Sequence, residues 1–376
     1  MFKKLKYLIF YLLLVDVSSF IRPFNRIRLN KLNSVNEYEY GKEYYEYLLE
    51  YGLIDNKSLL KSGYLGDIND IIEDRKDNYY IFENNYKKIL EFNNDNNSTF
   101  KLGINEFIDT FEIDKRNNLM KNNINYYEIV KNDFLGVKQI IEDPTYYLNK
   151  YKNLSDEFIW NSSIISDVKN QGRCGSCWAF SSTGAIEANM RINNFTIDRL
   201  SEQELVDCSK ENHGCNGGLM HLAFDYCIEN KGLTSNDNYN YSAKSNECLY
   251  NCNVTNTLKL DKINGSNIQD YKFTIPRSVL DLKASLLRGP ISIALDASQF
   301  EFRFYKDGVI DIPVRNNSRI NHAVLLTGYS KNENGSYWII QNSWGIKWGD
   351  NGYAKIRIKN GDGVLLCQLY GVYPYN

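Results

Sequence analysis

The 376-residue sequence has almost no net charge and few histidines, and each shortage excludes a class of function. Lys and Arg number 44 against 46 Asp and Glu, which gives a formal net charge of −2. This balance removes the electrostatic basis for binding nucleic acid. The histidines are His213, His221 and His322, and the sequence contains neither H-E-x-x-H nor a second C-x-x-C. Because zinc sites need such ligand clusters, we expect no metal and no cofactor.

Long apolar runs are also missing, apart from one near the start. Residues 1–19 combine a lysine-rich beginning with an apolar run at 7–15 and small residues near 18–19. This pattern is typical of a signal peptide, and the run is too short to span a membrane comfortably. An uncleaved signal anchor is the alternative. We expect the secretory pathway, with a lysosome, vacuole or the cell exterior as destination, and no membrane contact after cleavage.

The sequence has eight cysteines, seven of them between residues 174 and 252. In an oxidising compartment such cysteines form disulfides more often than zinc sites. Cys174 and Cys177 form a C-x-x-C, which could be a redox pair, half of a zinc site, or a nucleophile beside a structural cysteine. A redox motif is expected after a strand of a βαβ unit. This motif instead follows the polar segment SDVKNQGR.

The order of the sequence patterns predicts helices first and strands later. Residues 36–93 are helix-like, and GSCWAFSSTGAIEANMRI is typical of a helix buried in a core. Ser201 and Glu204 form a capping box that starts another helix. Beyond Pro290 the sequence is strand-like, and in GYAKIRIKN apolar and charged residues alternate, which predicts one solvent-facing side. A helical half followed by a sheet half predicts an α+β fold.

Cys177 has the support that a nucleophile needs. It starts the long apolar helix, where N–H groups and the helix dipole favour a thiolate. His322 opens one predicted strand, and Asn342 ends the next in QNSWG. Adjacent strands can bring these two residues together, which gives a Cys, His, Asn arrangement for nucleophilic catalysis.

On these motifs, residues 160–376 resemble the papain-like cysteine proteases, close to the cathepsin L branch. CGSCW and QNSWGIKWGDNGY carry the resemblance. It implies a two-subdomain fold, with a helical half and an antiparallel β-barrel-like half, and cysteine endopeptidase activity. Cys177 would be the nucleophile, His322 the acid/base, Asn342 the orienter of the imidazole, and Gln171 the oxyanion-hole side chain. A non-enzymatic homologue would usually have lost the cysteine or the histidine, and both are present.

The resemblance also implies a substrate-binding surface. The backbone of Gly217 and Gly218 would pair with an extended peptide, and Trp344 would shield the histidine and asparagine. The other implied contacts are Leu219, Met220, Ala294, Ile320, Asn321, Ala323 and Val372. All but Asn321 are apolar and would line the pocket for the residue two before the cleaved bond, with Val372 as its deepest wall. We expect Leu, Phe or Val there, and we expect protein substrates and cystatin-type inhibitors as partners.

The segment before the protease part resembles the family's inhibitory propeptide. GINEFID at residues 103–109 matches its G-x-N-x-F-x-D signature, and the helix face at 82–93 matches the second half of its helical signature. The first half departs, because Asp74 and Asn78 stand where the family has Glu and Arg. A salt bridge is therefore not expected at these positions.

We expect four segments from these features: a signal peptide at 1–19, a helical propeptide domain at about 36–110 within 20–152, a linker at about 111–152, and the mature protease at 153–376. The resemblance implies two disulfides: Cys174–Cys215 and Cys208–Cys248. Each would close a loop of about 40 residues and contribute about 3 to 4 kcal/mol. Cys227, Cys252 and Cys367 remain, and the sequence leaves open whether the first two pair.

Overall fold

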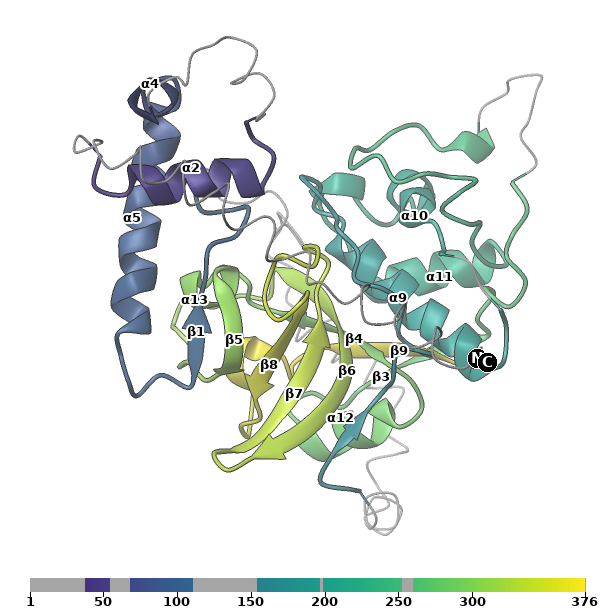
Figure 1. Ribbon diagram of the computed structural model, residues 1–376. Helices are drawn as coiled ribbons and strands as arrows, with labels where there is room; N and C mark the ends of the chain where they lie inside the picture. The colour runs from purple at the N-terminus through teal and green to yellow at the C-terminus, as the bar shows by residue number, and fades with distance from the viewer. Residues whose placement is uncertain (1–37, 55–67, 111–153, 197–198, 252–259, 376) are drawn as a thin grey trace, which may run out of the picture. The chain divides into compact units, whose positions relative to one another are not determined.

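The structure is a computed structural model (Figure 1). It describes residues 38–54, 68–110, 154–196, 199–251 and 260–375. The predicted signal peptide, the predicted linker and Cys252 lie outside the described residues. The chain forms two compact units, which divide within one helix at Lys88 and again at Phe107. The first unit holds residues up to 88 and 108–110, and the second holds 89–107 and the described residues from 154 onward.

The first unit is helical, as predicted, and its core is aromatic. Its helices are α2 (Gly41–Glu50), α4 (Ile68–Glu73) and α5 (Lys76–Asn93), the last of which continues into the second unit. Tyr44 is fully buried, and its ring packs 4.9 Å from Phe82 and 5.5 Å from Tyr79 between centroids. Aromatic pairs at such distances contribute to stability in addition to the contribution from the apolar surface that they bury.

Asp109 of the GINEFID signature is held in the first unit by hydrogen bonds. Its carboxylate accepts from the hydroxyls of Tyr47 at 2.9 Å and Tyr44 at 3.3 Å. Asn78, which stands at the position of the family's arginine, donates from its side chain to the Asp109 carbonyl at 2.8 Å. Burial raises the pKa of Asp109, although the two tyrosine hydroxyls act in the other direction.

The second unit begins its protease part with a helical half, residues 160–251. Its helices are α9 (Cys177–Ile192), α10 (Glu202–Cys208) and α11 (Met220–Glu229), with 3-10 turns η2 (Gly214–Asn216) and η3 (Leu249–Asn251). Every residue of α9 from Cys177 to Met190 is buried, which confirms the predicted core helix.

Only half of the predicted capping box forms at the start of α10. The Ser201 hydroxyl accepts from the Glu204 backbone N–H at 2.9 Å, as expected for an N-cap. The Glu204 carboxylate does not return this contact, because it accepts from the Thr234 N–H at 2.7 Å. The Ser201 N–H donates to the Thr234 carbonyl at 2.9 Å. Hydrogen bonds to Thr234 have therefore replaced the local bond between the Ser201 N–H and the Glu204 carboxylate.

The sheet half, residues 260–375, is a mixed sheet to which β1 and β2 add strands from earlier in the chain. The strand order is β1 (Phe100–Leu102), β5 (Tyr305–Ile310), β8 (Tyr353–Arg357), β7 (Gly335–Gln341), β6 (His322–Asn332), β4 (Ile291–Leu295), β9 (Gly371–Tyr375) and β3 (Asp270–Phe273), with β2 (Phe158–Ile159) also on β6. The helices are α12 (Val279–Leu286), α13 (Phe300–Arg303) and the 3-10 turn η4 (Val364–Leu366). The β5–β8 pair is parallel, so the sheet is not purely antiparallel as expected.

The predicted solvent-facing side of β8 is wrong at one position. Ala354 and Ile356 are buried and Lys355 is half-buried, as alternation requires. Arg357 is only 5% exposed, because its guanidinium lies 3.7 Å from the Asp311 carboxylate and also contacts Asn332. A paired arginine can thus occupy a position that the pattern assigned to solvent.

The two halves of the second unit pack through α9, which lies against β6 and β4 (Figure 1). Gly184 permits close approach, since a Cβ atom there would come within 3.2 Å of the Leu325 side chain. The Ser181 hydroxyl donates to the Val324 carbonyl at 2.9 Å, and the Ser292 hydroxyl donates to the Ser181 carbonyl at 2.9 Å. No helix among the described residues is both long and apolar enough to cross a membrane.

Candidate active site

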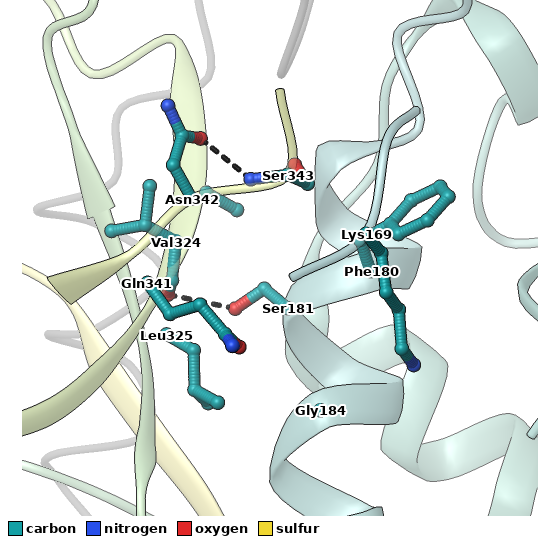
Figure 2. A pocket seen from close by; sticks show the side chains of 10 residues that line it. Lys169, Phe180, Ser181, Gly184, Val324, Leu325, Gln341, Asn342 and Ser343 are labelled. Atoms are coloured by element: carbon teal, nitrogen blue, oxygen red, sulfur yellow. Dashed lines mark hydrogen bonds between the residues drawn. The ribbon is translucent and has the colours of Figure 1, made fainter. Parts of the chain in front are cut away.

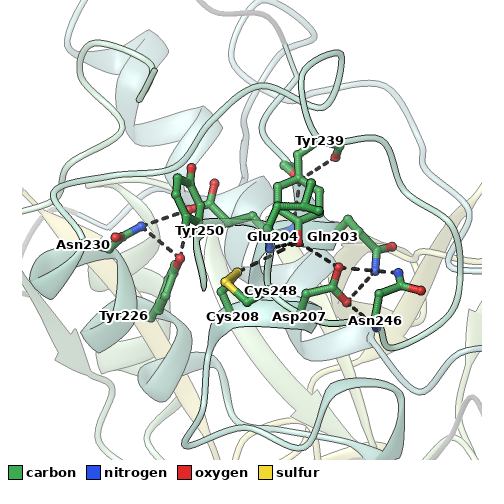
Figure 3. Close-up of a disulfide and its surroundings, with 12 residues drawn as sticks. Gln203, Glu204, Asp207, Cys208, Tyr226, Asn230, Tyr239, Asn246, Cys248 and Tyr250 are labelled. Carbon is green, nitrogen blue, oxygen red and sulfur yellow. Dashed lines mark hydrogen bonds between the residues drawn. A yellow bond between two sulfur atoms is a disulfide. The ribbon is translucent and has the colours of Figure 1, made fainter. Parts of the chain in front are cut away.

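The two cysteines of the C-x-x-C have different states. Cys174 is bonded to Cys215, and Cys177 is a free thiol. The second implied disulfide, Cys208–Cys248, is also present and lies beside Glu204 and Asp207 (Figure 3). The redox hypothesis for this motif is therefore not supported.

Two further thiols are free. Cys227 and Cys367 are both buried free thiols, and Cys252, the possible partner of Cys227, lies outside the described residues. Burial raises the pKa of the Cys227 thiol well above its usual value and that of Cys367 to about 12. Buried neutral thiols of this kind are chemically inert.

Cys177 is the first residue of α9 and is completely buried. The backbone N–H groups of Cys177, Trp178 and Ala323 interact with its sulfur and favour the thiolate. Burial outweighs them and raises the pKa of the Cys177 thiol to about 12. The contact with Ala323 brings the sulfur beside the start of β6, where the predicted acid/base lies.

His322 is the first residue of β6, and its ring is fixed from two sides. Its Nε2 lies 2.7 Å from Asn342 Oδ1, and its ring centroid lies 4.7 Å from that of Trp344. Because Asn342 Oδ1 only accepts hydrogen bonds, Nε2 carries the proton. Nδ1 is buried and has no hydrogen-bond partner among the described residues. The imidazole therefore keeps Nδ1 available as a base.

The buried state keeps the cysteine and histidine neutral. Burial lowers the pKa of His322 to about 4, while that of Cys177 is raised to about 12. Burial therefore favours the neutral thiol and the neutral imidazole in this structure.

Gln171 is held rigidly beside the nucleophile. Its side-chain oxygen accepts from the Ser343 hydroxyl at 2.7 Å, and its Nε2 donates to the Cys174 carbonyl at 2.8 Å. The Tyr241 hydroxyl, which also pairs with the Ser176 hydroxyl at 2.6 Å, donates to the Gln171 carbonyl at 2.7 Å. These hydrogen bonds fix the position of the Gln171 amide group.

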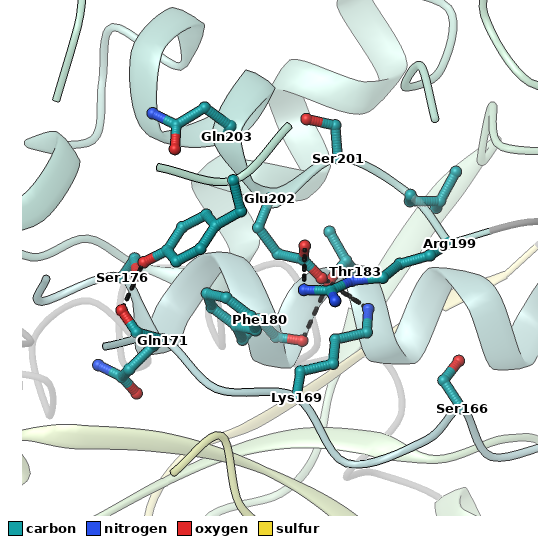
Figure 4. A network of polar contacts seen from close by, with 12 residues as sticks. Ser166, Lys169, Gln171, Ser176, Phe180, Thr183, Arg199, Ser201, Glu202 and Gln203 are labelled. Carbon is teal, nitrogen blue, oxygen red and sulfur yellow. Dashed lines mark hydrogen bonds and ion pairs between the residues drawn. The ribbon is translucent and has the colours of Figure 1, made fainter. Parts of the chain in front are cut away.

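A buried ionic network ties the segment before Gln171 to α9 and α10 (Figure 4). Lys169 lies 2.8 Å from Glu187 and 2.6 Å from Glu202, and both carboxylates are fully buried. Burial opposes the charge of Glu202, but Lys169 and Arg199 more than offset it and lower the pKa of Glu202. This network was missed in the sequence, because SDVKNQGR looks like an ordinary polar loop.

The structure brings most of the predicted substrate contacts together. Met220, Ala294, Ala323 and Val372 share one buried cluster with Cys177, and Ile320 packs against it. Leu219 is buried too, and its N–H donates to Asn212 Oδ1 at 2.7 Å.

Gly217 and Gly218 lie where the backbone conformation or close packing leaves no room for a side chain, and Asn321 is fixed by hydrogen bonds. Gly217 has a φ of 113°, and a Cβ on Gly218 would come within 2.7 Å of the Trp178 ring. Both positions therefore favour glycine. Asn321 faces inward: its side chain donates to Asp296 at 3.0 Å and accepts from the Ala297 N–H at 2.8 Å. These hydrogen bonds of Asn321 fix the chain immediately before His322.

One cavity opens between α9 and the strand ends, and it is too small for a substrate side chain. Its volume is about 20 Å³, enough for about one water molecule. Figure 2 shows Ser181 and Gly184 of α9 facing Val324, Leu325 and Gln341 across it. The described residues also contain no cluster of three or more His, Cys, Asp or Glu side chains arranged to hold a metal.

Comparison with known proteins identifies related sequences. The family model described as papain family cysteine protease matches residues 154–371, more than half of the chain. A KDEL-tailed cysteine endopeptidase of Arabidopsis thaliana is 34% identical over 309 residues, which cover 81% of each chain. A cathepsin L-like protein of Caenorhabditis elegans is 42% identical over 206 residues, 54% of this chain and 58% of that one.

Solved precursors share the fold beyond the protease part. Digestive procathepsin L 3 of Tenebrio molitor has a TM-score of 0.69 at 28% identity and covers 90% of this chain and 100% of its own. That coverage exceeds the segment matched by the family model, so the likeness extends into the N-terminal region. The predicted α+β papain-like fold is confirmed. The chain belongs to the papain family of cysteine proteases.

Proposed function

We propose that Cys177 and His322 form the catalytic pair of a cysteine endopeptidase. In the accessible enzyme, His322 Nδ1 takes the thiol proton, and the thiolate attacks the carbonyl carbon of the scissile bond. The developing oxyanion accepts hydrogen bonds from the Cys177 N–H and from Gln171 Nε2. The imidazolium gives its proton to the departing amine and leaves a thioester. Water, deprotonated by His322, hydrolyses the thioester and regenerates the thiol.

The hydrogen bond from His322 Nε2 to Asn342 supports this proposal most strongly. It selects the tautomer in which Nδ1 can accept the thiol proton, and it stabilises the imidazolium when that forms. Trp344 covers one ring face and limits solvent access to that bond. Asn342 and Trp344 would therefore act as positioning residues.

We further propose that the protein is made as a zymogen. Residues 89–107 belong to the same compact unit as the protease part, and β1 pairs with β5. Asn105 donates to the Arg303 carbonyl at 2.8 Å, and the Phe107 ring lies 5.0 Å from the ring of Trp344. Removal of the propeptide would expose the catalytic pair to solvent, which favours the charged forms that burial opposes.

Substrate preference and location follow from the same proposal. The apolar cluster around Met220 and Ala294 would accept an apolar side chain two residues before the cleaved bond. The destination of the protein would be a lysosome, a vacuole or the cell exterior, reached through the secretory pathway. Cystatin-type inhibitors stay a predicted partner.

Two matched cysteine variants test the catalytic role. Cys177→Ser should abolish hydrolysis of a fluorogenic peptide with Leu two before the cleaved bond, measured after acid activation. Cys367→Ser replaces another buried free thiol and should retain most of the activity. Equal activity of both variants would contradict the proposal.

A further inference from the structure

The hydroxyl of Tyr241 links Gln171 to Ser176, the residue before the proposed nucleophile. It donates to the Gln171 carbonyl at 2.7 Å and lies 2.6 Å from the Ser176 hydroxyl. A carbonyl oxygen only accepts hydrogen bonds, and a phenol has a single hydrogen to donate. That hydrogen lies toward Gln171, so Ser176 is the donor to Tyr241. The two hydrogen bonds therefore run in one direction, from Ser176 through Tyr241 to Gln171.

Ser176 makes this bond in place of a local one. It is the N-cap of α9, a position where a serine side chain usually accepts from a backbone N–H of the first helical turn. Its hydroxyl makes no such cap, although that of Ser201 does at the start of α10. Ser176 is fully buried, so its hydroxyl requires a partner, which is Tyr241. A residue that departs from its local preference in this way is typical of a functional site.

Tyr241 is itself held by the two helices beside it. Its ring packs edge-on against Phe180 of α9, with centroids 4.8 Å apart and planes at 88°. The next residue, Ser242, donates from its N–H to the Gln203 side chain of α10 at 2.8 Å. Burial raises the pKa of Tyr241, so the phenol stays neutral and keeps its hydrogen. Tyr241 can therefore fix Gln171 relative to α9.

The Gln171 carbonyl depends on such an external partner. The residue that follows it is Gly172, whose φ of 58° lies in the region that favours glycine. Glycine restrains the adjoining peptide group less than other residues do. The remaining contacts of Gln171 are on other atoms: its N–H donates to the Ser343 carbonyl at 2.8 Å, and its side chain contacts Ser343 and Cys174.

We propose that Tyr241, oriented by Ser176, is a positioning residue that keeps Gln171 aligned with the oxyanion. This inference rests on the proposed function, in which Gln171 Nε2 is an oxyanion donor. A donor aimed at charge that develops in the transition state lowers the barrier without binding the substrate more tightly. Loss of its alignment should therefore lower kcat and change KM little.

Two matched tyrosine variants test the hydroxyl. Tyr241→Phe keeps the ring beside Phe180 and should lower kcat about tenfold for the fluorogenic peptide after acid activation, with KM within about twofold. Tyr239→Phe removes a hydroxyl that instead donates to Asp207 at 3.0 Å, and kcat should stay within about twofold. An unchanged kcat in Tyr241→Phe, or equal losses in both variants, would overturn the inference.

Thiol exchange separates this role from a general disturbance of the site. Cys177 is treated with a small aromatic disulfide, whose sulfur the thiolate attacks without forming an oxyanion. The exchange rate of Tyr241→Phe should match that of wild type within about twofold. A fall in this rate as large as the fall in kcat would show a displaced nucleophile and would refute the positioning role.

A double variant tests whether Tyr241 acts through Gln171. Gln171→Ala should lower kcat about a hundredfold or more, as expected for the loss of one oxyanion donor. Addition of Tyr241→Phe should then lower kcat by less than about threefold, because coupled residues are not additive. A further tenfold loss would contradict the coupling.

Ser176→Ala is the second variant, should Tyr241→Phe not fold. It removes the hydroxyl that donates to Tyr241 and should lower kcat about threefold. No loss in this variant would refute the role of Ser176. If wild type hydrolyses no peptide, or Gln171→Ala keeps full kcat, the proposed mechanism fails and the inference with it. If both behave as proposed and Tyr241→Phe keeps full kcat, only the positioning role fails.

Discussion

The helical and sheet halves of the protease part are held together by different forces. The helical half contains both disulfides and the fully buried carboxylates paired with Lys169. Among the described residues of the sheet half no disulfide occurs, and Cys367 stays reduced. Its interior relies on strand pairing and on packed rings, such as Trp344 and Trp348 at 5.5 Å.

This difference corresponds to the two members of the proposed catalytic pair. The helical half holds Cys177 through the Cys174–Cys215 disulfide, which lies just before the start of α9, and through the ion pair of Glu187 further along the same helix. The sheet half fixes His322 through β6 pairing, the Asn342 hydrogen bond and the Trp344 ring. The proposed nucleophile and the proposed base therefore depend on separate interactions, and a substitution can weaken the support of one without touching the other.

The largest effect on stability is expected from the ionic network. Lys169→Met leaves two buried carboxylates without their main cation and should lower the free energy of unfolding by roughly 3 to 5 kcal/mol. Urea unfolding followed by tryptophan fluorescence measures this change. Lys331→Met removes an exposed lysine that pairs with Asp156, and the unfolding midpoint should not move. Equal unfolding midpoints for both variants would show that the ionic network does not contribute to stability.

Removal of the Cys208–Cys248 disulfide should come next. The double variant Cys208→Ser, Cys248→Ser should lose about 3 kcal/mol, because its unfolded state regains the freedom of a long loop. Limited proteolysis should then cut first between residues 208 and 248. First cuts in the sheet half would instead show that this disulfide is not what stabilises the helical half.

Asn342→Ala should affect catalysis more than stability. A hydrogen bond to a charged imidazolium contributes about 1.5 to 3 kcal/mol, so kcat/KM should fall by about tenfold to a hundredfold. The loss should appear mainly in kcat, since Asn342 orients His322 and does not contact substrate. A loss confined to KM would contradict this role.

The smallest expected effect compares one helix cap in each half. Ser201 caps α10 at 2.9 Å from the Glu204 N–H, and Ser278 caps α12 at 3.2 Å from the Asp281 N–H. Each alanine variant should lose about 1 kcal/mol of unfolding free energy. Similar losses would show that the two halves differ in disulfides and buried ion pairs and not in helix capping. A much larger loss for Ser278→Ala would show that the sheet half depends more strongly on its helix cap.

Local patterns in the sequence predicted local features well. The start of α9 at Cys177 and the Ser201 cap follow from short-range signals, and the disulfides followed from the family resemblance. The failures involve distant partners. Arg357 pairs with Asp311, and Lys169 pairs with Glu187 and Glu202, and neither pairing leaves a local signal in the sequence.

Strand register illustrates the same limit. Val372 was placed beside the expected pocket by motif resemblance, and only the pairing of β9 with β4 shows that Val372 lies opposite Ser292 and that Tyr370 lies opposite Ala294. A strand shift of two residues keeps the same face and the same alternation, so the sequence pattern cannot distinguish the two. His221 gave no signal for its contact with Tyr370, because the two are separated by 149 residues.

The pH dependence of Cys177 labelling tests most directly whether the thiol of one half is activated by the imidazole of the other. A thiol-directed epoxide is applied to acid-activated protein, and the modified peptide is mapped. In wild type, labelling at Cys177 should follow a pKa near about 4, as for a thiolate paired with histidine. In His322→Ala it should shift to about 8.5. The same dependence in both proteins, or modification at another cysteine, would contradict the account.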